Sequence, residues 1–166
     1  RDGRVSRYSA EDEELFGVFG LALDETRQTL WAATSAVPEM SGFTPEQKGR
    51  AALAAFSLVT GELLRVIDVP SDGRDHVLGD LVVAPDGTIY ATDSAAPIIW
   101  RYLPGGEEMD KLVEYPDFVS LRGLVLTNRT LIVADFANGL FAIDLSESSP
   151  VVRAFTPPPN ATLVGL

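Results

Sequence analysis

The sequence predicts an all-β protein built from repeated four-stranded units, and three observations support this prediction. The chain has 166 residues, of which 46% are apolar and 22% charged, and this composition suits one globular domain with a substantial core. Three segments with the same pattern recur along the chain, and each reads as strand, turn and strand. Matched positions in the second half of the chain recur about every 42 residues.

The three repeated segments share both their strand residues and their turn chemistry. They begin at Gly20, Asp80 and Gly123. Each first strand carries alternating Leu or Val residues, and such short apolar runs are typical of strands buried on both faces. Asp86-Gly87 and Asn128-Arg129 lie between the paired strands and have the chemistry of tight turns. We therefore expect a hairpin turn at each of these two dipeptides.

Each unit continues with a second pair of strands. Four short strands in about 42 residues are typical of one blade of a β-propeller. The second pairs are read from 54–58 with 63–67, from 98–102 with 112–113, and from 140–143 with 151–152. The predicted boundaries are 1–15 for an N-terminal tail or lead-in strand, about 16–77, 78–120 and 121–160 for three blades, and 161 for the start of the next inner strand.

Propellers close with about four to eight blades, so three blades and the start of a fourth form an open arc. We expect the remaining blades of a six-bladed ring to come from the same chain. The alternative is that a second copy of the chain covers the open sheet edges.

The first unit is about 17 residues longer than the others, and the extra residues fall in 35–50. Thr44 followed by Pro45 predicts a short helix of at most two turns, with Thr44 as the N-cap. Insertions of this length are surface decoration or functional loops, and the sequence leaves both open.

Composition excludes several classes of partner. Thirteen Lys and Arg residues against 24 Asp and Glu residues give a net charge of −11, which disfavours nucleic acid and anionic membrane surfaces. The longest apolar run, 51–56, is too short to span a bilayer. Cysteine is absent and His76 is the single histidine, which excludes thiolate sites and two-His metal motifs. The compartment stays open between cytoplasmic and exported.

The repeated strings resemble the senescence marker protein, gluconolactonase and luciferin-regenerating enzyme family, and more loosely strictosidine synthase and NHL-repeat propellers. The resemblance covers about 17–166. It rests on LVVAPDGTIYATDS at 81–94, RGLVLTNRTLIVADFANGLFAIDL at 122–145 and VGL at the end. It implies a six-bladed propeller that takes a small molecule at the mouth of its central channel. It also implies a divalent cation there, such as calcium, held by Asn, Asp and Glu.

The positions that match the family's metal ligands have different residues here. The resemblance places three of the ligands on Gly79, Arg122 and Val164, and none of these side chains supplies an oxygen ligand. The family's acidic ligand near the N-terminus has no securely matched position, although Glu13 or Glu14 could supply one. We therefore predict no metal and no other cofactor at the channel mouth.

Four residues are the candidates for a ligand pocket: Asp80, Arg122, Asp93 and Asp135. If inner strands start at the mouth, second strands end there, so all four share that face. In a functional interpretation Arg122 binds a carboxylate or phosphate while a carboxylate acts as a base. In a structural interpretation Asp93 and Asp135 fix the turns that follow them, and Arg122 pairs with Asp80. Because Asp93 and Asp135 occupy equivalent places in the repeat, the structural interpretation is favoured.

A hydrolytic triad is a further possibility, since His76 and Asp75 adjoin in sequence and Ser71 and Ser94 lie nearby in sequence or on the same face. No Gly-x-Ser-x-Gly motif supports it. We interpret His76 as a surface residue that precedes a strand, and we assign no catalytic residues.

Two function hypotheses follow from these observations. The first is a propeller that binds a small molecule, or a divergent hydrolase of lactone-like or ester-like substrates. The second is a metal-dependent lactonase that acts on sugar-lactone-like substrates, or a propeller that binds another protein. Because one fold hosts many functions, the residues at the mouth must decide between them.

Overall fold

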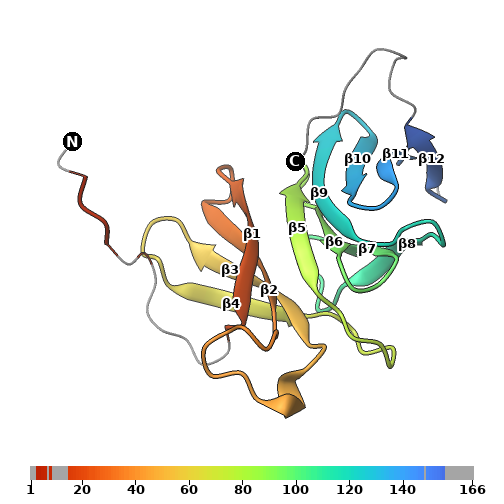
Figure 1. Ribbon diagram of the computed structural model, residues 1–166. Helices are drawn as coiled ribbons and strands as arrows, with labels where there is room; N and C mark the ends of the chain where they lie inside the picture. The colour runs from red at the N-terminus through yellow and green to blue at the C-terminus, as the bar shows by residue number, and fades with distance from the viewer. Residues whose placement is uncertain (1–2, 7, 9–14, 148, 156–166) are drawn as a thin grey trace.

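The computed structural model describes residues 3–6, 8, 15–147 and 149–155 (Figure 1). These residues form twelve β-strands and one short 3-10 helix, which confirms the predicted all-β class. No helix in the described ranges is long and apolar enough to cross a membrane. The predicted strand from 161, and the positions Glu13, Glu14 and Val164, lie outside the described residues.

The strands form three antiparallel four-stranded sheets, which we call blades 1, 2 and 3. Within each blade the strands pair in chain order. Blade 1 contains β1 (Gly17–Asp24), β2 (Thr29–Ser35), β3 (Ala51–Ser57) and β4 (Leu63–Asp68). Blade 2 contains β5 (Leu78–Val83), β6 (Ile89–Asp93), β7 (Ile98–Tyr102) and β8 (Asp110–Glu114). Blade 3 contains β9 (Leu121–Thr127), β10 (Thr130–Asp135), β11 (Gly139–Asp144) and β12 (Val151–Phe155).

The two predicted hairpin turns are confirmed. Asp86-Gly87 joins β5 to β6, and Gly87 has a φ of 91°, a conformation that favours glycine. Asn128 joins β9 to β10 with a φ of 53°, which asparagine tolerates better than most residues do. Both turns therefore follow from local backbone chemistry.

The insertion between β2 and β3 contains one turn of 3-10 helix, η1 (Pro45–Gln47), which confirms the predicted short helix. Its start is fixed by a capping box in which the Thr44 N–H donates to Gln47 Oε1 at 3.0 Å. The insertion ends against the β4–β5 connection, where the His76 N–H donates to the Gly49 carbonyl at 3.0 Å. Lys48 Nζ lies 2.9 Å from Asp75 Oδ2 in the same place.

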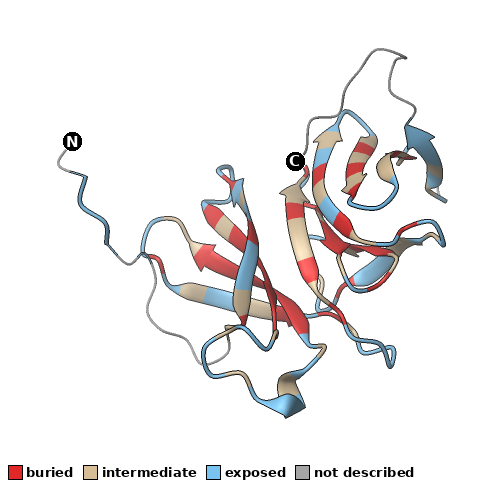
Figure 2. Ribbon diagram, viewed as in Figure 1, coloured by how far each residue is buried: buried red, intermediate tan, exposed pale blue. Residues whose placement is uncertain are grey.

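The three blades stand side by side, with the first strands β1, β5 and β9 adjacent in that order (Figure 1). One hydrophobic core lies between blades 1 and 2 and includes Trp31 and Trp100. A second core lies between blades 2 and 3 and includes Phe118 and Phe141. Figure 2 shows the buried residues running along the strands of all three sheets. Packing between neighbouring blades therefore stabilises the fold.

Blade 1 departs from the prediction that inner strands are buried on both faces. Leu81 and Leu124 occupy matched positions in β5 and β9 and are only 4% and 6% exposed, because each packs on the preceding blade. Leu21 has the same position in β1 and is 59% exposed. The prediction is wrong for β1, because no blade precedes it among the described residues, and for β9, where Val125 is 57% exposed on the face opposite Leu124.

Candidate functional site

One end of the blades gathers the predicted pocket residues. The antiparallel order places the starts of β5 and β9 at the same end as the ends of β6 and β10. Asp80 and Arg122 lie near the strand starts, and Asp93 and Asp135 are the last residues of β6 and β10. We call this end the mouth face.

Asp93 is fully buried, and both of its carboxylate oxygens are used within the fold. Oδ1 accepts hydrogen bonds from the backbone N–H groups of Val77, Ala95 and Ala96 at 3.0–3.1 Å. Oδ2 accepts from Trp100 Nε1 at 3.0 Å and lies 2.7 Å from a ring nitrogen of His76. This carboxylate joins the β4–β5 connection to the β6–β7 turn.

Asp135 has the same role in blade 3 that Asp93 has in blade 2, because it joins the segment before the inner strand to the turn after the second strand. Its Oδ2 accepts from the backbone N–H groups of Val119 and Ser120, and its Oδ1 accepts from those of Ala137 and Asn138, all at 2.8–2.9 Å. Burial opposes ionisation, but the four N–H donors outweigh it and hold the pKa of Asp135 below its usual value. The contacts of Asp93 and Asp135 match the interpretation in which these residues fix turns.

His76 is buried, with only 2% of its surface exposed, so the interpretation of a surface histidine is wrong. Its Nδ1 lies 2.7 Å from Asp93 Oδ2, its Nε2 lies 3.1 Å from Asp72 Oδ1, and its ring packs edge-on against Trp100. The imidazole ring can be buried because each of its nitrogens has a carboxylate partner, Asp93 or Asp72. The hypothetical triad is not assembled, because the ring nitrogens of His76 contact Asp93 and Asp72 and not Ser71 or Ser94. The hydroxyl of Ser94 donates instead to the Leu121 carbonyl at 2.7 Å.

A network of exposed charges continues outward from His76. Arg74 lies between two carboxylates, with Nη2 at 2.6 Å from Asp72 Oδ2 and Nη1 at 2.7 Å from Glu114 Oε1. Hydrogen bonds from Arg74 hold the pKa values of both carboxyl groups below their usual values. Lys111 also contacts both carboxylates. Each charge in this network has a partner of opposite sign, so the network is self-contained.

Asp80 differs from the other acidic candidates because it lies where the inner strands approach each other. A Cβ placed on Gly20 would lie 2.9 Å from Asp80 Cα and 3.0 Å from its Oδ1, and one placed on Gly123 would lie 3.6 Å from its Oδ2. Glycine at 20 and 123 therefore leaves room for one carboxylate between three strands. Oδ2 accepts from the Leu124 N–H at 3.2 Å, whereas Oδ1 accepts no hydrogen bond from the described residues.

Thr92 links the inner strands at the same level. The Asp80 N–H donates to Thr92 Oγ1 at 3.0 Å, and this hydroxyl donates to the Arg122 carbonyl at 2.7 Å. A polar chain from β5 through β6 to β9 therefore fixes the backbone positions of Asp80 and Arg122.

Arg122 does not pair with Asp80, so that part of the structural interpretation is wrong. Its side chain is exposed, and its guanidinium lies 6.0 Å from the ring centre of Phe136. Phe136 follows β10 and is 83% exposed. Among the described arginines, only Arg122 and Arg153 have a guanidinium that makes no hydrogen bond or ion pair. Arg122 is thus available to a ligand at the mouth face.

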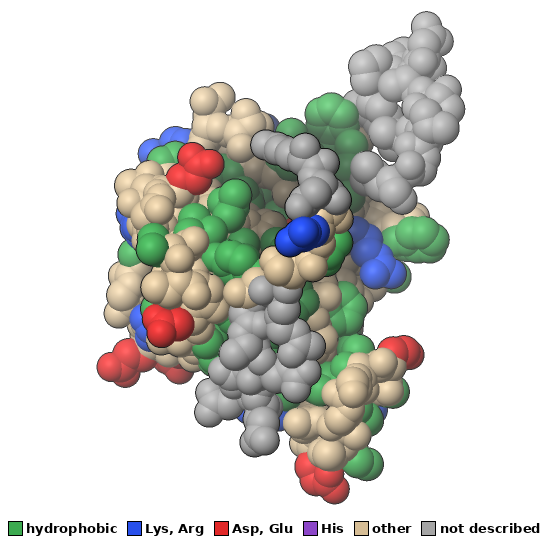
Figure 3. Space-filling model, turned by 90° about the vertical axis from the view of Figure 1, so that its left-hand side faces the viewer, with side chains coloured by type: hydrophobic (Ala, Val, Ile, Leu, Met, Phe, Trp, Pro, Cys, Tyr) green, Lys and Arg blue, Asp and Glu red, His purple; other side chains and the backbone are tan. Residues whose placement is uncertain are grey.

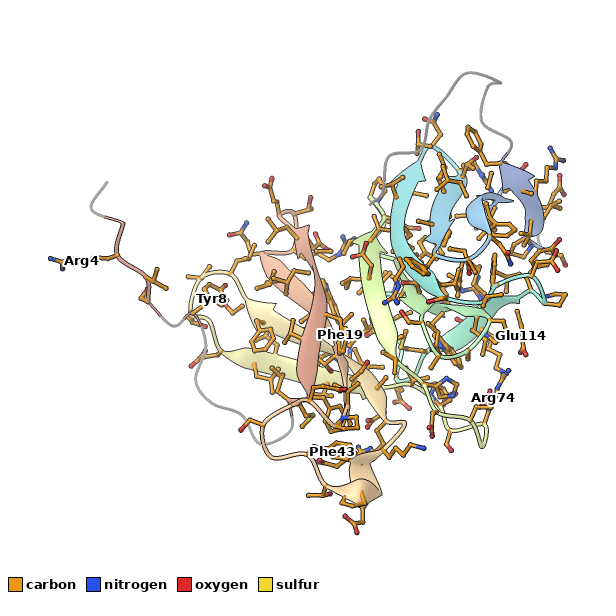
Figure 4. All side chains as sticks on the ribbon, in the orientation of Figure 1. Arg4, Tyr8, Phe19, Phe43, Arg74 and Glu114 are labelled. Carbon is orange, nitrogen blue, oxygen red and sulfur yellow. The ribbon has the colours of Figure 1, made fainter. Side chains whose placement is uncertain are left out.

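The aromatic residues at the mouth face were not predicted from the sequence. Phe19, which occupies the position of Arg122 in blade 1, is 48% exposed and lies beside β1 on the side of β5 (Figure 4). Phe136 occupies the position that is Ser35 in blade 1 and Ser94 in blade 2. The signal for Phe136 was present in the repeat, because a large apolar residue replaces a small polar one in one blade only.

The residues at the mouth do not fit a divalent cation. At the positions that match the family's ligands, Gly79 has no side chain and Arg122 carries a positive charge. The described ranges contain no group of three or more His, Cys, Asp or Glu residues arranged to hold a metal ion. Among the four predicted pocket residues, only Asp80 has a carboxylate oxygen, Oδ1, that accepts no hydrogen bond from the described residues.

Comparison with known proteins supports the fold class. No protein-family model and no curated protein matches this chain. Solved structures do match, and they define the chain as a β-propeller at low identity. The Dos1 propeller aligns with a TM-score of 0.61 at 6% identity over 87% of this chain and 34% of its own length. Virginiamycin B lyase from Staphylococcus aureus aligns with a TM-score of 0.60 at 15% identity over 89% and 44%. A gluconolactonase from Xanthomonas campestris aligns with a TM-score of 0.54 at 15% identity over 89% and 64%.

These three structures share the fold of this chain at identities too low to carry a function across. The chain spans between 34% and 64% of their lengths. The propeller prediction is confirmed, whereas the finer resemblance to the gluconolactonase family stays a prediction.

Proposed function

We propose that this chain is a ligand-binding β-propeller whose mouth face binds a small hydroxylated carboxylate. The observation that carries the proposal is the exposed guanidinium of Arg122, which no carboxylate of the described residues neutralises. In a chain with a net charge of −11, such an arginine is an isolated positive site. An anionic group is the ligand chemistry that this site favours.

The neighbours of Arg122 define the rest of the ligand. A guanidinium presents a planar fork of N–H donors that matches the two oxygens of a carboxylate. Asp80, on the adjacent inner strand, offers Oδ1 as an acceptor for a hydroxyl group. The exposed ring of Phe136 gives the carbon skeleton of the ligand an apolar surface. A sugar acid such as gluconate combines a carboxylate, hydroxyl groups and a short carbon chain.

A calorimetric titration of the intact 166-residue chain with sodium gluconate tests this proposal, with glucose as the uncharged counterpart. We expect gluconate to bind and glucose to bind at least tenfold more weakly, because a charge-assisted hydrogen-bond pair contributes on the order of 1.5–3 kcal/mol. Arg122→Gln should weaken gluconate binding at least tenfold.

The matched control is Arg129→Gln, an exposed arginine at the turn of the same hairpin whose guanidinium bonds the carbonyls of Leu145 and Ser146. This variant should bind gluconate with unchanged affinity. An equal loss of gluconate affinity in both variants would mean that the positive charge acts at long range and not by a direct contact with Arg122. Unchanged gluconate affinity in Arg122→Gln would contradict the proposal.

A divergent lactonase is the second candidate, and the free Oδ1 of Asp80 favours it. A carboxylate at the mouth can accept a proton from a water molecule that attacks the lactone carbonyl, which then opens to the hydroxy acid. If this is the function, δ-gluconolactone should hydrolyse faster with the wild-type chain than in buffer alone. Asp80→Asn should return the rate to that of buffer while gluconate binding persists. A rate equal to buffer in the wild type would leave the binding function and remove the enzymatic one.

A further inference from the structure

The outer rim between blades 1 and 2 contains a groove that is separate from the mouth site. Its volume is about 670 Å³, which lies in the range of ligand-binding sites. One wall is the end of the 35–50 insertion, and a second wall is β4 with the connection to β5. Glu107 and Glu108, from the β7–β8 turn, form the third wall. The insertion, whose role the sequence left open, thus helps to form a groove between two blades.

The strand that borders this groove, β4, has an unpaired edge. It is the last strand of blade 1, and among the described strands it pairs with β3 only. The Val69 N–H donates to the carbonyl of Ala51, the residue opposite it in the antiparallel register, at 2.8 Å. Because backbone groups alternate in direction along a strand, the N–H and C=O groups of Val66 and Asp68 point to the outer edge. Both residues line the groove, which therefore presents backbone donors and acceptors at the spacing that another strand needs.

The basic residues of the groove are neutralised within the fold, whereas two of its carboxylates are not. Lys48 pairs with Asp75, Arg50 with Asp68, and Arg74 with Asp72 and Glu114. Glu107 and Glu108 are exposed and make no hydrogen bond or ion pair with the described residues. Figure 3 shows one side of the molecule, on which acidic side chains are scattered among hydrophobic and neutral ones. Two adjacent unpaired glutamates in one groove are a local concentration of negative charge, and they favour a basic occupant.

A second groove, between blades 2 and 3, lacks this combination. It lies beside β8 and has a volume of about 410 Å³. Its basic residues, Arg101 and Lys111, have carboxylate partners, and Glu147 is its one carboxylate without a partner among the described residues. The paired glutamates and the insertion wall therefore distinguish the groove between blades 1 and 2.

We propose that the groove between blades 1 and 2 binds an extended basic segment of a partner protein, which adds a strand to the outer edge of β4. The backbone of the segment bonds the outward N–H and C=O groups of Val66 and Asp68. Side chains at alternate positions of a strand share a face, so lysine or arginine at every second position lies on the side of Glu107 and Glu108. This site does not use Arg122, so its test is independent of gluconate binding.

Fluorescence anisotropy of a labelled peptide with the 166-residue chain tests the proposal, with a peptide of about seven residues that alternates lysine and valine. We expect this peptide to bind, and a peptide with glutamate in place of lysine to bind at least tenfold more weakly. Glu107→Gln combined with Glu108→Gln should weaken binding of the lysine peptide at least tenfold. The matched control is Glu25→Gln combined with Glu147→Gln, which changes the net charge equally at exposed glutamates outside the groove. Its affinity should stay within twofold of wild type.

Proline at position 66 tests strand addition separately from charge. The Val66 N–H points to the outer edge, so Val66→Pro removes an edge donor and keeps the hydrogen bonds between β3 and β4. This variant should lose peptide binding at least tenfold while its circular dichroism matches that of wild type. A lysine and valine peptide with N-methylated backbone amides should fail to bind the wild-type chain, which tests the same contact without changing the protein.

Absence of binding by the lysine peptide at about 1 mM would overturn the proposal. Equal binding of the glutamate peptide, or equal loss in the two double variants, would do the same. Full binding by the N-methylated peptide would overturn strand addition. A dimer of the chain that forms without peptide and is abolished by Val66→Pro would assign the edge of β4 to a second copy, and this result too would overturn the proposal.

Discussion

Two positions of the repeated blade show how differently this molecule uses its polar residues. The end of the second strand carries Thr34, Asp93 and Asp135 in blades 1, 2 and 3, and all three side chains bond within the fold. The start of the inner strand carries Phe19, Gly79 and Arg122, and the one charged residue there points to solvent. The comparison teaches that a polar role repeated from blade to blade is structural. A charge that occurs in one blade only is available for function.

The largest expected effect is at Asp93, whose carboxylate accepts four hydrogen bonds and contacts a ring nitrogen of His76. Asp93→Ala would leave three backbone N–H groups, Trp100 Nε1 and His76 without their acceptor in a buried place. We expect it to lower the unfolding free energy by about 4 kcal/mol, measured by urea denaturation. A loss below about 1 kcal/mol would break the comparison, because Asp93 would then not be a structural residue.

Asp135 should show a smaller loss together with a pH signature. Its four backbone donors hold its folded pKa below the unfolded value, so its stabilisation is present above the unfolded pKa and is lost as pH falls through the folded pKa. Wild-type unfolding free energy should therefore decline below about pH 4. Asp135→Asn should cost about 2 kcal/mol at pH 7 and flatten part of that decline. An unaltered acid decline would show that Asp135 is not among the groups responsible.

Thr34 occupies in blade 1 the position of Asp93 and Asp135, but its side chain makes a single hydrogen bond. It therefore tests whether the number of hydrogen bonds at this position sets its contribution to stability. Its Oγ1 donates to the Ala52 carbonyl at 2.9 Å in a fully buried place. Thr34→Val keeps the shape and removes the donor, so we expect a loss of about 1 kcal/mol in unfolding free energy. A loss as large as that of Asp93→Ala would mean that the number of bonds at this position does not set its contribution.

The smallest stability effect is expected at Arg122. Its side chain is exposed, and its guanidinium makes no hydrogen bond or ion pair with the described residues, so Arg122→Gln should change the unfolding free energy by less than about 0.5 kcal/mol. Thermal denaturation at low and high salt measures this change. A loss above 1 kcal/mol would assign Arg122 a structural role and remove it from the proposed site.

Local patterns explain why the fold could be predicted. The hairpin at Asp86-Gly87 and the helical turn capped by Thr44 depend on neighbours in sequence, and both are confirmed. The site could be predicted less completely because it depends on contacts across blades. The ring nitrogens of His76 contact Asp72, four residues earlier, and Asp93, which is brought near only by folding. Phe136 could have been found from the repeat, because the matched positions in blades 1 and 2 are Ser35 and Ser94.

The most direct test of the central claim measures unfolding free energy and gluconate affinity in the same two variants. We predict that Asp135→Ala loses about 3 kcal/mol of stability while its folded fraction binds gluconate with affinity within twofold of wild type. Arg122→Gln should keep wild-type stability and lose at least tenfold in affinity. The opposite pattern, with affinity lost in Asp135→Ala and retained in Arg122→Gln, would contradict the separation between repeated structural residues and unique functional ones.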